Sequence, residues 1–281
     1  MRLVTMRTGS GTRAGRVEAD TVTELPFADV GDLLRSGADW RARASVDGRR
    51  HRMDGVELGA VISSPAKIIC LGLNYVSHIT EMSRELPEHP TLFAKYASAL
   101  IGPTDPIPLP PESSAVDWEA ELAVVIGASV RRVPTGDAGR AIAGYAVAND
   151  VSMRDWQNRT LQWLQGKTFE ASTPLGPALV TPDELPGDPA APDLDIRSEV
   201  DGVVMQLART GDLLFGPAQC ISYISTFMTL EPGDVILTGT PAGVGMGRDP
   251  AVFLKPGQVV RVAIEGIGEL VNRCEAEGAA P

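Results

Sequence analysis

Apolar residues in the larger, second part of the chain occur in short runs bounded by glycines. Four such runs are AELAVVIG at 120–127, GYAVAND at 144–150, GDVILTG at 233–239 and GQVVRVAIEGIGELVNRC at 257–274. Runs of this length and punctuation are typical of β-strands. In residues 196–207, Asp201-Gly202 separates IRSEV from VVMQL, and an Asp-Gly pair between two such runs indicates a β-hairpin.

Helical segments are few. We expect helices at 137–143 and at 217–228, the second starting with a proline, which is favourable at the first helical position. A third is expected after Ser152, because Ser152-x-x-Asp155 is a capping-box pattern. Strands and helices do not alternate regularly, which argues against a doubly wound parallel sheet. The predicted fold class is therefore α+β, predominantly β.

Residues 1–62 differ from the rest of the chain, because they are polar and rich in turn-forming residues. They contain short β-like pieces and one helical stretch, FADVGDLLRSG at 27–37. A more apolar region begins with SSPAKIICLGLNY at 63–75. We therefore expect a small N-terminal domain at 1–62 and a main domain at 63–281.

The sequence DWEAELAVVIG at 117–127 places three carboxylates where a strand should begin. In a strand, Asp117, Glu119 and Glu121 share one face, and crowding like charges there is costly. A sheet edge with solvated acids would explain an isolated Glu-x-Glu. Here the acids lead into an apolar strand, and Asp150 closes a second one. A hard divalent cation, Mg²⁺, Mn²⁺ or Ca²⁺, would make such crowding favourable.

Composition narrows the classes of partner. The formal net charge of −11 disfavours nucleic acid and anionic membranes. No stretch approaches the roughly 20 apolar residues that span a bilayer, and the N-terminus has no apolar signal region, so we expect a cytoplasmic protein. The three cysteines are widely spaced and make neither a disulfide framework nor a zinc site.

Two further groups of residues are candidates for chemistry. His78 and Glu81 share a face in a helical turn, and a carboxylate can orient a histidine as a general base. A surface ion pair is the alternative. Arg154, Gln157 and Lys167 can hydrogen-bond an oxyanion or a carboxylate, although an ordinary amphipathic helix would look the same.

The glycine-rich stretch TGTPAGVGMG at 238–247 is not a dinucleotide site. It follows an apolar run, but RDPAVFLKPG comes next instead of a helix. No GxSxG elbow or phosphate-binding loop is present. A loop beside a site is the better interpretation.

Several segments, in their order along the chain, resemble the fumarylacetoacetate hydrolase family over roughly residues 66–271. They are GLNYVSHITEM, PTLFAKYASALIGP, DWEAELAVVIG, GYAVANDVSMRDWQ, QGKTFEASTPLGP and FMTLEPGDVILTGTPAGVG. The resemblance implies a mixed β-roll catalytic domain behind a small N-terminal domain, and a homodimer. TFEAS departs from the commoner SFDT-like sequence, and Glu170 within it bears on the choice of substrate.

The resemblance also implies roles for individual residues. Glu119, Glu121 and Asp150 would bind Mg²⁺ or Mn²⁺, with Asp117 outside the ligand set. The catalytic residues that it implies are His78, Glu81 and Lys167. The substrate-binding residues that it implies are Arg154, Gln157 and Thr240.

The leading functional hypothesis is metal-dependent hydrolysis of a C–C bond in an acylpyruvate or related β-diketo acid. His78 would activate water, and the metal would stabilise the departing enolate. An oxaloacetate-type decarboxylase, or an isomerase of the 2-hydroxyhepta-2,4-diene-1,7-dioate type, could use the same site. A non-catalytic, metal-stabilised binding protein is the alternative from another class. In the enzymatic cases the partner is a small anionic keto acid.

Overall fold

The computed structural model describes residues 1–81 and 85–278, and of His78 and Glu81 it describes only the backbone. Strands predominate over helices, as the sequence predicted. Eleven strands of the described chain form one large sheet, ordered β4-β3-β2-β1-β13-β11-β10-β16-β5-β6, with β7 beside β13. These strands are β1 (Arg2–Thr8), β2 (Gly11–Glu18), β3 (Thr21–Glu24), β4 (Arg50–Arg52), β5 (Ile68–Gly72), β6 (Thr91–Lys95), β7 (Leu100–Ile101), β10 (Ala120–Ile126), β11 (Ile142–Asn149), β13 (Thr173–Val180) and β16 (Val235–Leu237).

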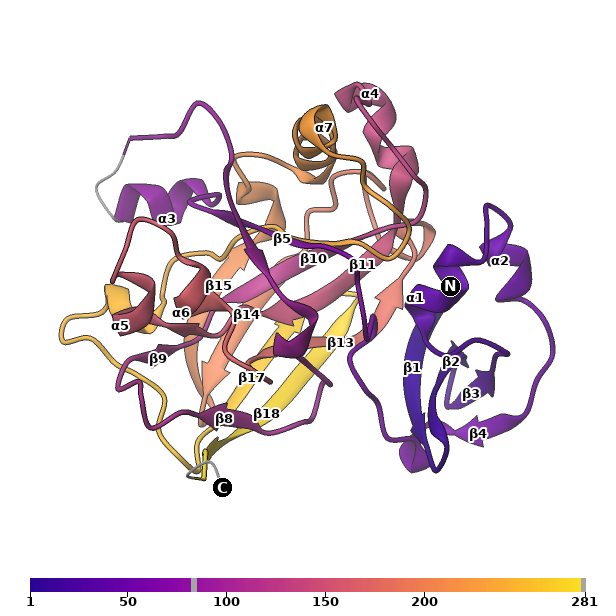
Figure 1. The fold of residues 1–281 in the computed structure, drawn as a ribbon, viewed down its shortest axis with the longest axis horizontal. Coiled ribbons are helices and arrows are strands. Elements are labelled where there is room, and N and C mark those ends of the chain that lie inside the picture. Colours follow the sequence, from indigo (N-terminus) through magenta and orange to yellow (C-terminus); the bar gives the residue numbers. More distant parts are fainter. Residues whose placement is uncertain (82–84, 279–281) are drawn as a thin grey trace.

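A second sheet packs on one face of the large one (Figure 1). Its order is β15-β14-β17-β18-β8. The strands are β8 (Ile107–Leu109), β14 (Asp195–Val200), β15 (Val203–Arg209), β17 (Val259–Ile264) and β18 (Gly268–Ala276), and a separate pair joins β9 (Val116–Asp117) to β12 (Ser152–Met153). Val124 and Tyr145 of the large sheet share a hydrophobic cluster with Ile196 and Val262 of the second. The core of the roll therefore lies between the sheets.

The predicted hairpin at Asp201-Gly202 is confirmed. Strands β14 and β15 pair antiparallel, with Val200 opposite Val203. Asp201 and Gly202 have φ angles of 51° and 78°. Two successive positive φ angles are the geometry of a tight two-residue hairpin turn, which Asp-Gly favours.

Both faces of β10 are buried, and this arrangement places the acidic side chains. Leu122 and Val124 point into the core between the sheets, whereas Ala123 and Val125 pack in the cluster on the opposite face. Because side chains alternate along a strand, Glu121 lies on the face of Ala123. The carboxylates thus leave the inter-sheet core and lie at the end of the other face.

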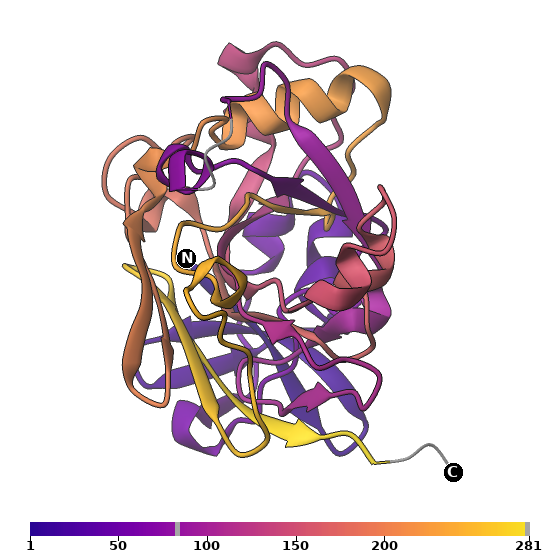
Figure 2. The ribbon, with the colours of Figure 1, turned by 90° about the vertical axis from the view of Figure 1, so that its left-hand side faces the viewer.

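The helices are short, except for α7. They are α1 (Val30–Arg35), α2 (Trp40–Arg43), α3 (Val76–Glu81), α4 (Thr135–Ala138), α5 (Arg154–Gln157), α6 (Leu164–Lys167) and α7 (Pro217–Phe227). Single 3₁₀ turns are η1 (Met53–Gly55), η2 (Ala97–Ala99), η3 (Gly139–Ala141), η4 (Pro182–Glu184), η5 (Thr210–Asp212) and η6 (Gly245–Gly247). Figure 2 shows α7 covering one end of the molecule. No helix in the described residues is long and apolar enough to cross a membrane.

The helix predictions hold to different degrees. The helix expected at 217–228 matches α7, whereas the one expected at 137–143 gives way to strand β11 at Ile142. The capping box at Ser152 is wrong: Ser152 lies in β12, and its hydroxyl donates to the carbonyl of Asp150 at 2.8 Å. Helix α5 begins only at Arg154 and has no side-chain cap.

The N-terminal segment continues the large sheet. Strand β1 pairs antiparallel with β13. This pairing joins the N-terminal segment, coloured indigo in Figure 1, to the rest of the large sheet. Leu3 and Leu33 belong to the same hydrophobic cluster as Val125 and Leu175. The N-terminal segment therefore shares a core with the roll, and the domain division after residue 62 stays a prediction.

Candidate active site

Three buried carboxylates meet at the end of the β10–β11 pair. Glu121 lies opposite Ala148 in this antiparallel pair, and the amide of Asp150 donates to the carbonyl of Glu119 at 2.9 Å. Glu119 therefore faces Asp150 across the strands, with Glu121 beside them. One carboxylate oxygen from each of the three lies within 4.8 Å of the others. Their exposed fractions are 6%, 1% and 0% for Glu119, Glu121 and Asp150. We call these three residues the carboxylate trio.

Two buried lysines neutralise part of the trio. Lys167, at the end of α6, places its Nζ 2.5 Å from Glu119 and 2.9 Å from Asp150. Lys95, at the end of β6, places its Nζ 2.5 Å from the other oxygen of Asp150. Glu121 accepts a hydrogen bond from the amide of Gly239 at 2.7 Å.

The pKa values of these groups diverge. Burial raises the pKa of Glu121 well above its ordinary value, and the nearby charges of Asp150 and Glu119 raise it further. Burial alone would also raise the pKa of Asp150, but Lys167 and Lys95 hold it below its ordinary value. Burial opposes the charge of Lys167, yet Asp150 and Glu119 raise its pKa overall. Lys167 therefore stays protonated, while Glu121 is costly to ionise.

The carboxylate trio fits a hard divalent cation. Its donors are all carboxylate oxygens, which Mg²⁺, Mn²⁺ and Ca²⁺ prefer. The buried groups around it comprise four carboxylates (Asp117, Glu119, Glu121, Asp150) and three cations (Lys95, Arg154, Lys167), a net charge of −1 if all are ionised. A divalent cation would change this to +1 and relieve the repulsion that opposes ionisation of Glu121. The trio can thus hold a metal ion.

Arg154 bridges the trio and the pocket. Its Nε donates to Asp117 at 2.8 Å, and its Nη1 lies 2.9 Å from Gln157 Oε1 and 2.7 Å from Glu119 Oε1. The Nη2 group is buried and has no hydrogen-bond partner among the described side chains. A buried unpaired donor is costly, so Nη2 is suited to an oxygen of a bound ligand.

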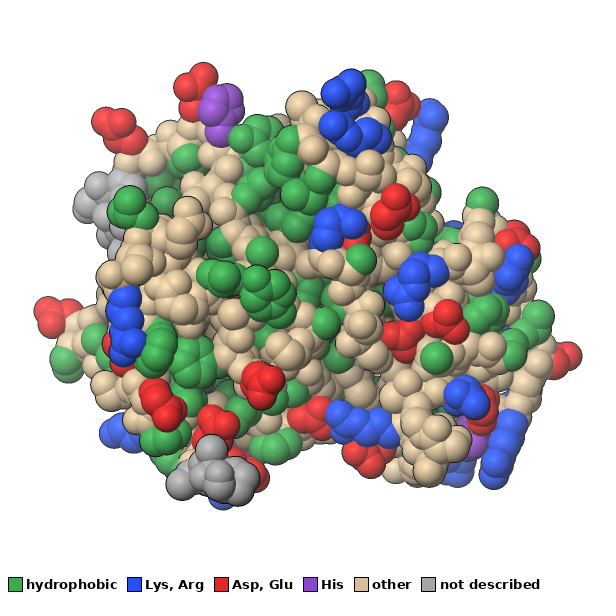
Figure 3. Space-filling model, viewed as in Figure 1, with side chains coloured by type: hydrophobic (Ala, Val, Ile, Leu, Met, Phe, Trp, Pro, Cys, Tyr) green, Lys and Arg blue, Asp and Glu red, His purple; other side chains and the backbone are tan. Residues whose placement is uncertain are grey.

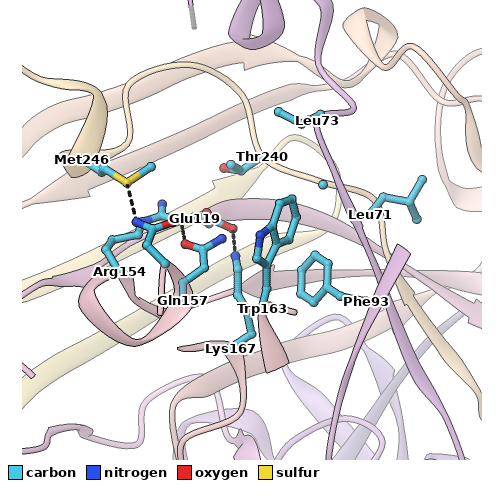
Figure 4. Close-up of a pocket in the computed structure, with 12 residues that line it drawn as sticks. Leu71, Leu73, Phe93, Glu119, Arg154, Gln157, Trp163, Lys167, Thr240 and Met246 are labelled. Atoms are coloured by element: carbon cyan, nitrogen blue, oxygen red, sulfur yellow. Dashed lines mark hydrogen bonds and ion pairs between the residues drawn. The ribbon is translucent and has the colours of Figure 1, made fainter. Parts of the chain in front are cut away.

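A small cavity of about 120 Å³ opens above these groups. Its lining comprises Leu71, Gly72, Leu73, Phe93, Glu119, Arg154, Gln157, Asn158, Trp163, Lys167, Thr240 and Met246 (Figure 4). The Phe93 and Trp163 rings meet edge to face, with centroids 5.5 Å apart. A Cβ on Gly72 would overlap the Trp163 ring. Glycine at this position therefore lets an aromatic wall close one side of the cavity.

Sequence comparison identifies the family. The family model described as Fumarylacetoacetate (FAA) hydrolase C-terminal matches residues 67–275, most of the chain. The chain belongs to the fumarylacetoacetate hydrolase family. Members of this family are enzymes that act on small organic substrates.

Individual family members are similar over most of the chain. One from Xenopus laevis, described as "Oxaloacetate tautomerase fahd2, mitochondrial", is 47% identical over 235 residues, 82% of this chain and 73% of that protein. A solved fumarylacetoacetate hydrolase from Exiguobacterium antarcticum has a TM-score of 0.88 and 35% identity, covering 99% of this chain and 100% of that one. A solved 5-carboxymethyl-2-hydroxymuconate delta-isomerase from Mycobacterium smegmatis has a TM-score of 0.81 and 37% identity, with coverages of 99% and 100%.

The remaining residues that the family resemblance implied are Thr240, His78 and Glu81. Thr240 lines the cavity, and its hydroxyl accepts a hydrogen bond from Gln206 at 2.8 Å. The backbone of His78 and Glu81 lies in α3, which is anchored by the Ser77 hydroxyl donating to Asp212 at 2.6 Å. The side chains of His78 and Glu81 are outside the described residues. Their catalytic roles stay predictions.

Several residues of this site were given no role by the sequence analysis. The first is Lys95, whose signal is a lysine that ends an apolar strand. The second is Asp117, which pairs with Arg154 and lies apart from the carboxylate trio. The aromatic wall of Phe93 and Trp163 has no signal in local sequence, because the two rings come from segments about 70 residues apart that meet only in the folded chain.

Proposed function

We propose that this fumarylacetoacetate hydrolase family member is a metal-dependent enzyme that interconverts the keto and enol forms of a small 2-oxo dicarboxylic acid of the oxaloacetate type. The observation that carries the proposal is the buried pocket floor, where Lys167 lies between Glu119 and Asp150 beside a cavity of about 120 Å³. The Xenopus laevis relative is described as an oxaloacetate tautomerase, which supports the substrate class.

The carboxylate trio would hold Mg²⁺ or Mn²⁺. A divalent cation there would supply Lewis-acid polarisation of the substrate's oxygens. With the ion bound, the buried charge changes from −1 to +1, which favours an anionic substrate. Arg154 Nη2, unpaired among the described residues, would donate to a carboxylate of that substrate.

Tautomerisation requires only proton transfer, and the chain offers a group for each end. His78, oriented by Glu81, would take the proton from the carbon beside the keto group. Lys167, whose Nζ lies 2.5 Å from Glu119 and 2.9 Å from Asp150, would donate to the keto oxygen as it becomes a hydroxyl. Proton exchange with water then resets both groups. No bond between heavy atoms breaks, so the cavity needs no attacking water.

Hydrolysis of an acylpyruvate is the second candidate. The solved fumarylacetoacetate hydrolase from Exiguobacterium antarcticum supports it, because that enzyme shares the fold over 99% of this chain. The same His78 would then deprotonate water, and Lys167 with Gln157 would stabilise the oxyanion formed by its attack. Decarboxylation of oxaloacetate, the third outcome, would release CO₂ and leave pyruvate.

One assay with oxaloacetate and acetylpyruvate separates these reactions. The near-ultraviolet absorbance of the enol is followed with Mg²⁺ and with EDTA, while pyruvate, acetate and CO₂ are measured in the same samples. We expect magnesium-dependent relaxation of enol absorbance without new products. Acetate plus pyruvate from acetylpyruvate would favour hydrolysis, and CO₂ from oxaloacetate would favour decarboxylation. No reaction with either compound would contradict all three and favour a binding protein.

Variants assign the residues. H78A should slow relaxation by about 10²-fold or more if His78 is the base. K167M should cause a comparable loss, because the methionine keeps the length of the side chain but has no proton to donate. K67M is the matched control, since Lys67 pairs with Asp234 at 2.8 Å and does not line the cavity. Equal activity of K167M and K67M would contradict the role of Lys167.

Two broader features are part of the proposal. We propose a homodimer, supported by exposed apolar residues on β15. We propose a cytoplasmic location, whereas the Xenopus laevis relative is described as mitochondrial.

A further inference from the structure

Asp117 is a fully buried carboxylate outside the trio, and backbone and side-chain donors surround it. Its Oδ1 accepts from the amides of Trp118 at 2.8 Å and Gly245 at 2.7 Å. Its Oδ2 accepts from the amide of Met246 at 2.9 Å and from Arg154 Nε at 2.8 Å. Four donors, one of them charged, compensate the burial of one carboxylate.

These contacts join two parts of the pocket. Arg154 and Met246 both line the cavity, yet they come from α5 and from the glycine-rich loop around η6. A Cβ on Gly245 would lie 2.7 Å from Asp117 Oδ1, so glycine allows the loop to approach this close. One carboxylate therefore anchors both the loop and the guanidinium.

The direction of the guanidinium follows from this anchoring. Asp117 binds the Nε edge, and Gln157 and Glu119 bind Nη1. Nη2 is then the remaining donor of a guanidinium that lines the cavity, and it is buried without a partner in the described part of the structure. An arginine held on two sides loses little further freedom when a ligand carboxylate binds.

We propose that Asp117 is a positioning residue, which sets the orientation of Arg154 and of loop 243–247 and thereby the affinity of the pocket for a carboxylate of the substrate. This inference rests on the proposed function for the identity of the ligand. The orientation of Arg154 can be measured without any ligand.

The test combines binding with a double-mutant cycle. D117N keeps the shape of the side chain but removes the charge that faces Arg154. With Mg²⁺ present, we expect calorimetric titration to show oxalate binding about 10-fold or more weaker in D117N, as for loss of a charge-assisted contact. In an R154M background D117N should add less than about twofold, because the effect passes through Arg154. The same loss in both backgrounds, or unchanged affinity in D117N, would overturn the proposal.

A matched control separates positioning from stability. Asp234 is also fully buried, accepts from the amides of Lys67 and Glu231 at 3.0 and 2.7 Å, and pairs with Lys67 Nζ at 2.8 Å, but it lines no part of the cavity. D234N should lower the melting temperature and leave oxalate affinity unchanged. If D234N weakened oxalate binding as much as D117N does, the effect of D117N would be explained by lost stability. That result would overturn the positioning role of Asp117.

A ligand-free readout separates this inference from the proposed function. In ¹⁵N-labelled wild type, the Arg154 Nε–H signal, assigned by its absence in R154M, should exchange slowly with water. It should shift and exchange faster in D117N. If wild type binds no oxalate and leaves oxaloacetate unchanged while this signal still responds, the proposed function fails and the positioning stands. An unresponsive signal overturns the positioning. D117E, which displaces the charge by one methylene, replaces D117N if that variant does not fold, with the same expected outcomes.

Discussion

At the scale of single residues, the site depends on a carboxylate that is unfavourable without a partner cation. Glu119 faces Asp150 across adjacent strands, and both contact Lys167. Glu121 has the amide of Gly239 as a partner, and its pKa is raised well above the ordinary value by burial and by the other two carboxylates. Like charges opposite one another destabilise a sheet. Glu121 is therefore the member of the trio whose ionisation most needs a metal.

The unfavourable ionisation of Glu121 predicts how the stability of E121Q responds to metal. Wild type should gain about 5–10 °C in melting temperature with Mg²⁺ or Mn²⁺ at a hundredfold excess over the dissociation constant. E121Q should lose most of this gain, because the amide keeps the shape but supplies no charge. In EDTA at neutral pH, E121Q should be at least as stable as wild type, since burial opposes ionisation of Glu121. Differential scanning fluorimetry measures both effects.

The control for E121Q is E269Q. Glu269, on β18, is about half exposed and pairs with Arg261 at 2.7 Å. Its variant should therefore show the full metal response. An equal metal response in E121Q and E269Q would contradict a metal site at the trio. A large loss of E121Q stability in EDTA would instead contradict the inference that ionised Glu121 is unfavourable without a metal.

At the scale of elements, local sequence predicts what local forces decide. The strand at 120–126, the hairpin at Asp201-Gly202 and helix α7 are all found where the pattern places them. The cap at Ser152 fails because a longer-range interaction prevails: Ser152 pairs with Asp117 in the β9–β12 ladder. The helix expected at 137–143 is shortened because Ile142 joins β11. Strand pairing with distant residues is invisible to a capping pattern.

An ion pair between elements predicts a pH dependence of stability. Arg7 of β1 binds both oxygens of Asp105, at 2.6 and 2.5 Å, and the amide of Gly102 donates to Asp105 at 2.6 Å. Burial would raise the pKa of Asp105, but Arg7 and Gly102 lower it overall. A carboxylate with a lowered folded pKa stabilises the fold above its unfolded pKa of about 4, and this stability is lost as pH falls through the folded value.

D105N should therefore unfold at lower urea than wild type at pH 7, and the difference should shrink at pH 3. The comparison between the two proteins at each pH isolates Asp105, because the other carboxylates titrate in both. D54N is the control, since Asp54 pairs with Arg52 while both are about 70% exposed, and such pairs contribute little. A difference between D105N and wild type that is constant, or larger at pH 3, would contradict the assignment.

At the scale of the whole molecule, the pocket is assembled from distant segments. The sequence places the trio because two strands carry its members, and adjacent apolar strands are expected to pair. It does not place Phe93, Trp163 and Met246, which reach the same cavity from β6, from the turn before α6 and from η6. The way the sheets roll decides which loops meet at the cavity. The local pattern of hydrophobic and polar residues does not encode this. Substrate size is therefore a property of the fold and not of any one motif.

Assembly is the last property of the whole molecule. Among the described strands, β15 pairs on one side only, with β14. It carries Val203 and Leu207, which are 60% and 71% exposed. Figure 2 shows this hairpin at the outer edge of the molecule. Exposed apolar residues on an edge strand promote association, and a two-fold axis lets the same strip contact its own copy.

We therefore predict that wild type is a dimer in sedimentation velocity and that L207K shifts it toward monomer. The melting temperature of the monomeric form should change little, because Leu207 lies outside the core. F227K is the control: Phe227 is 52% exposed on α7, near which hydrophobic side chains also gather in Figure 3. If F227K dissociates the dimer and L207K does not, the α7 face is the interface instead. A wild type that is monomeric at all concentrations would contradict the dimer itself.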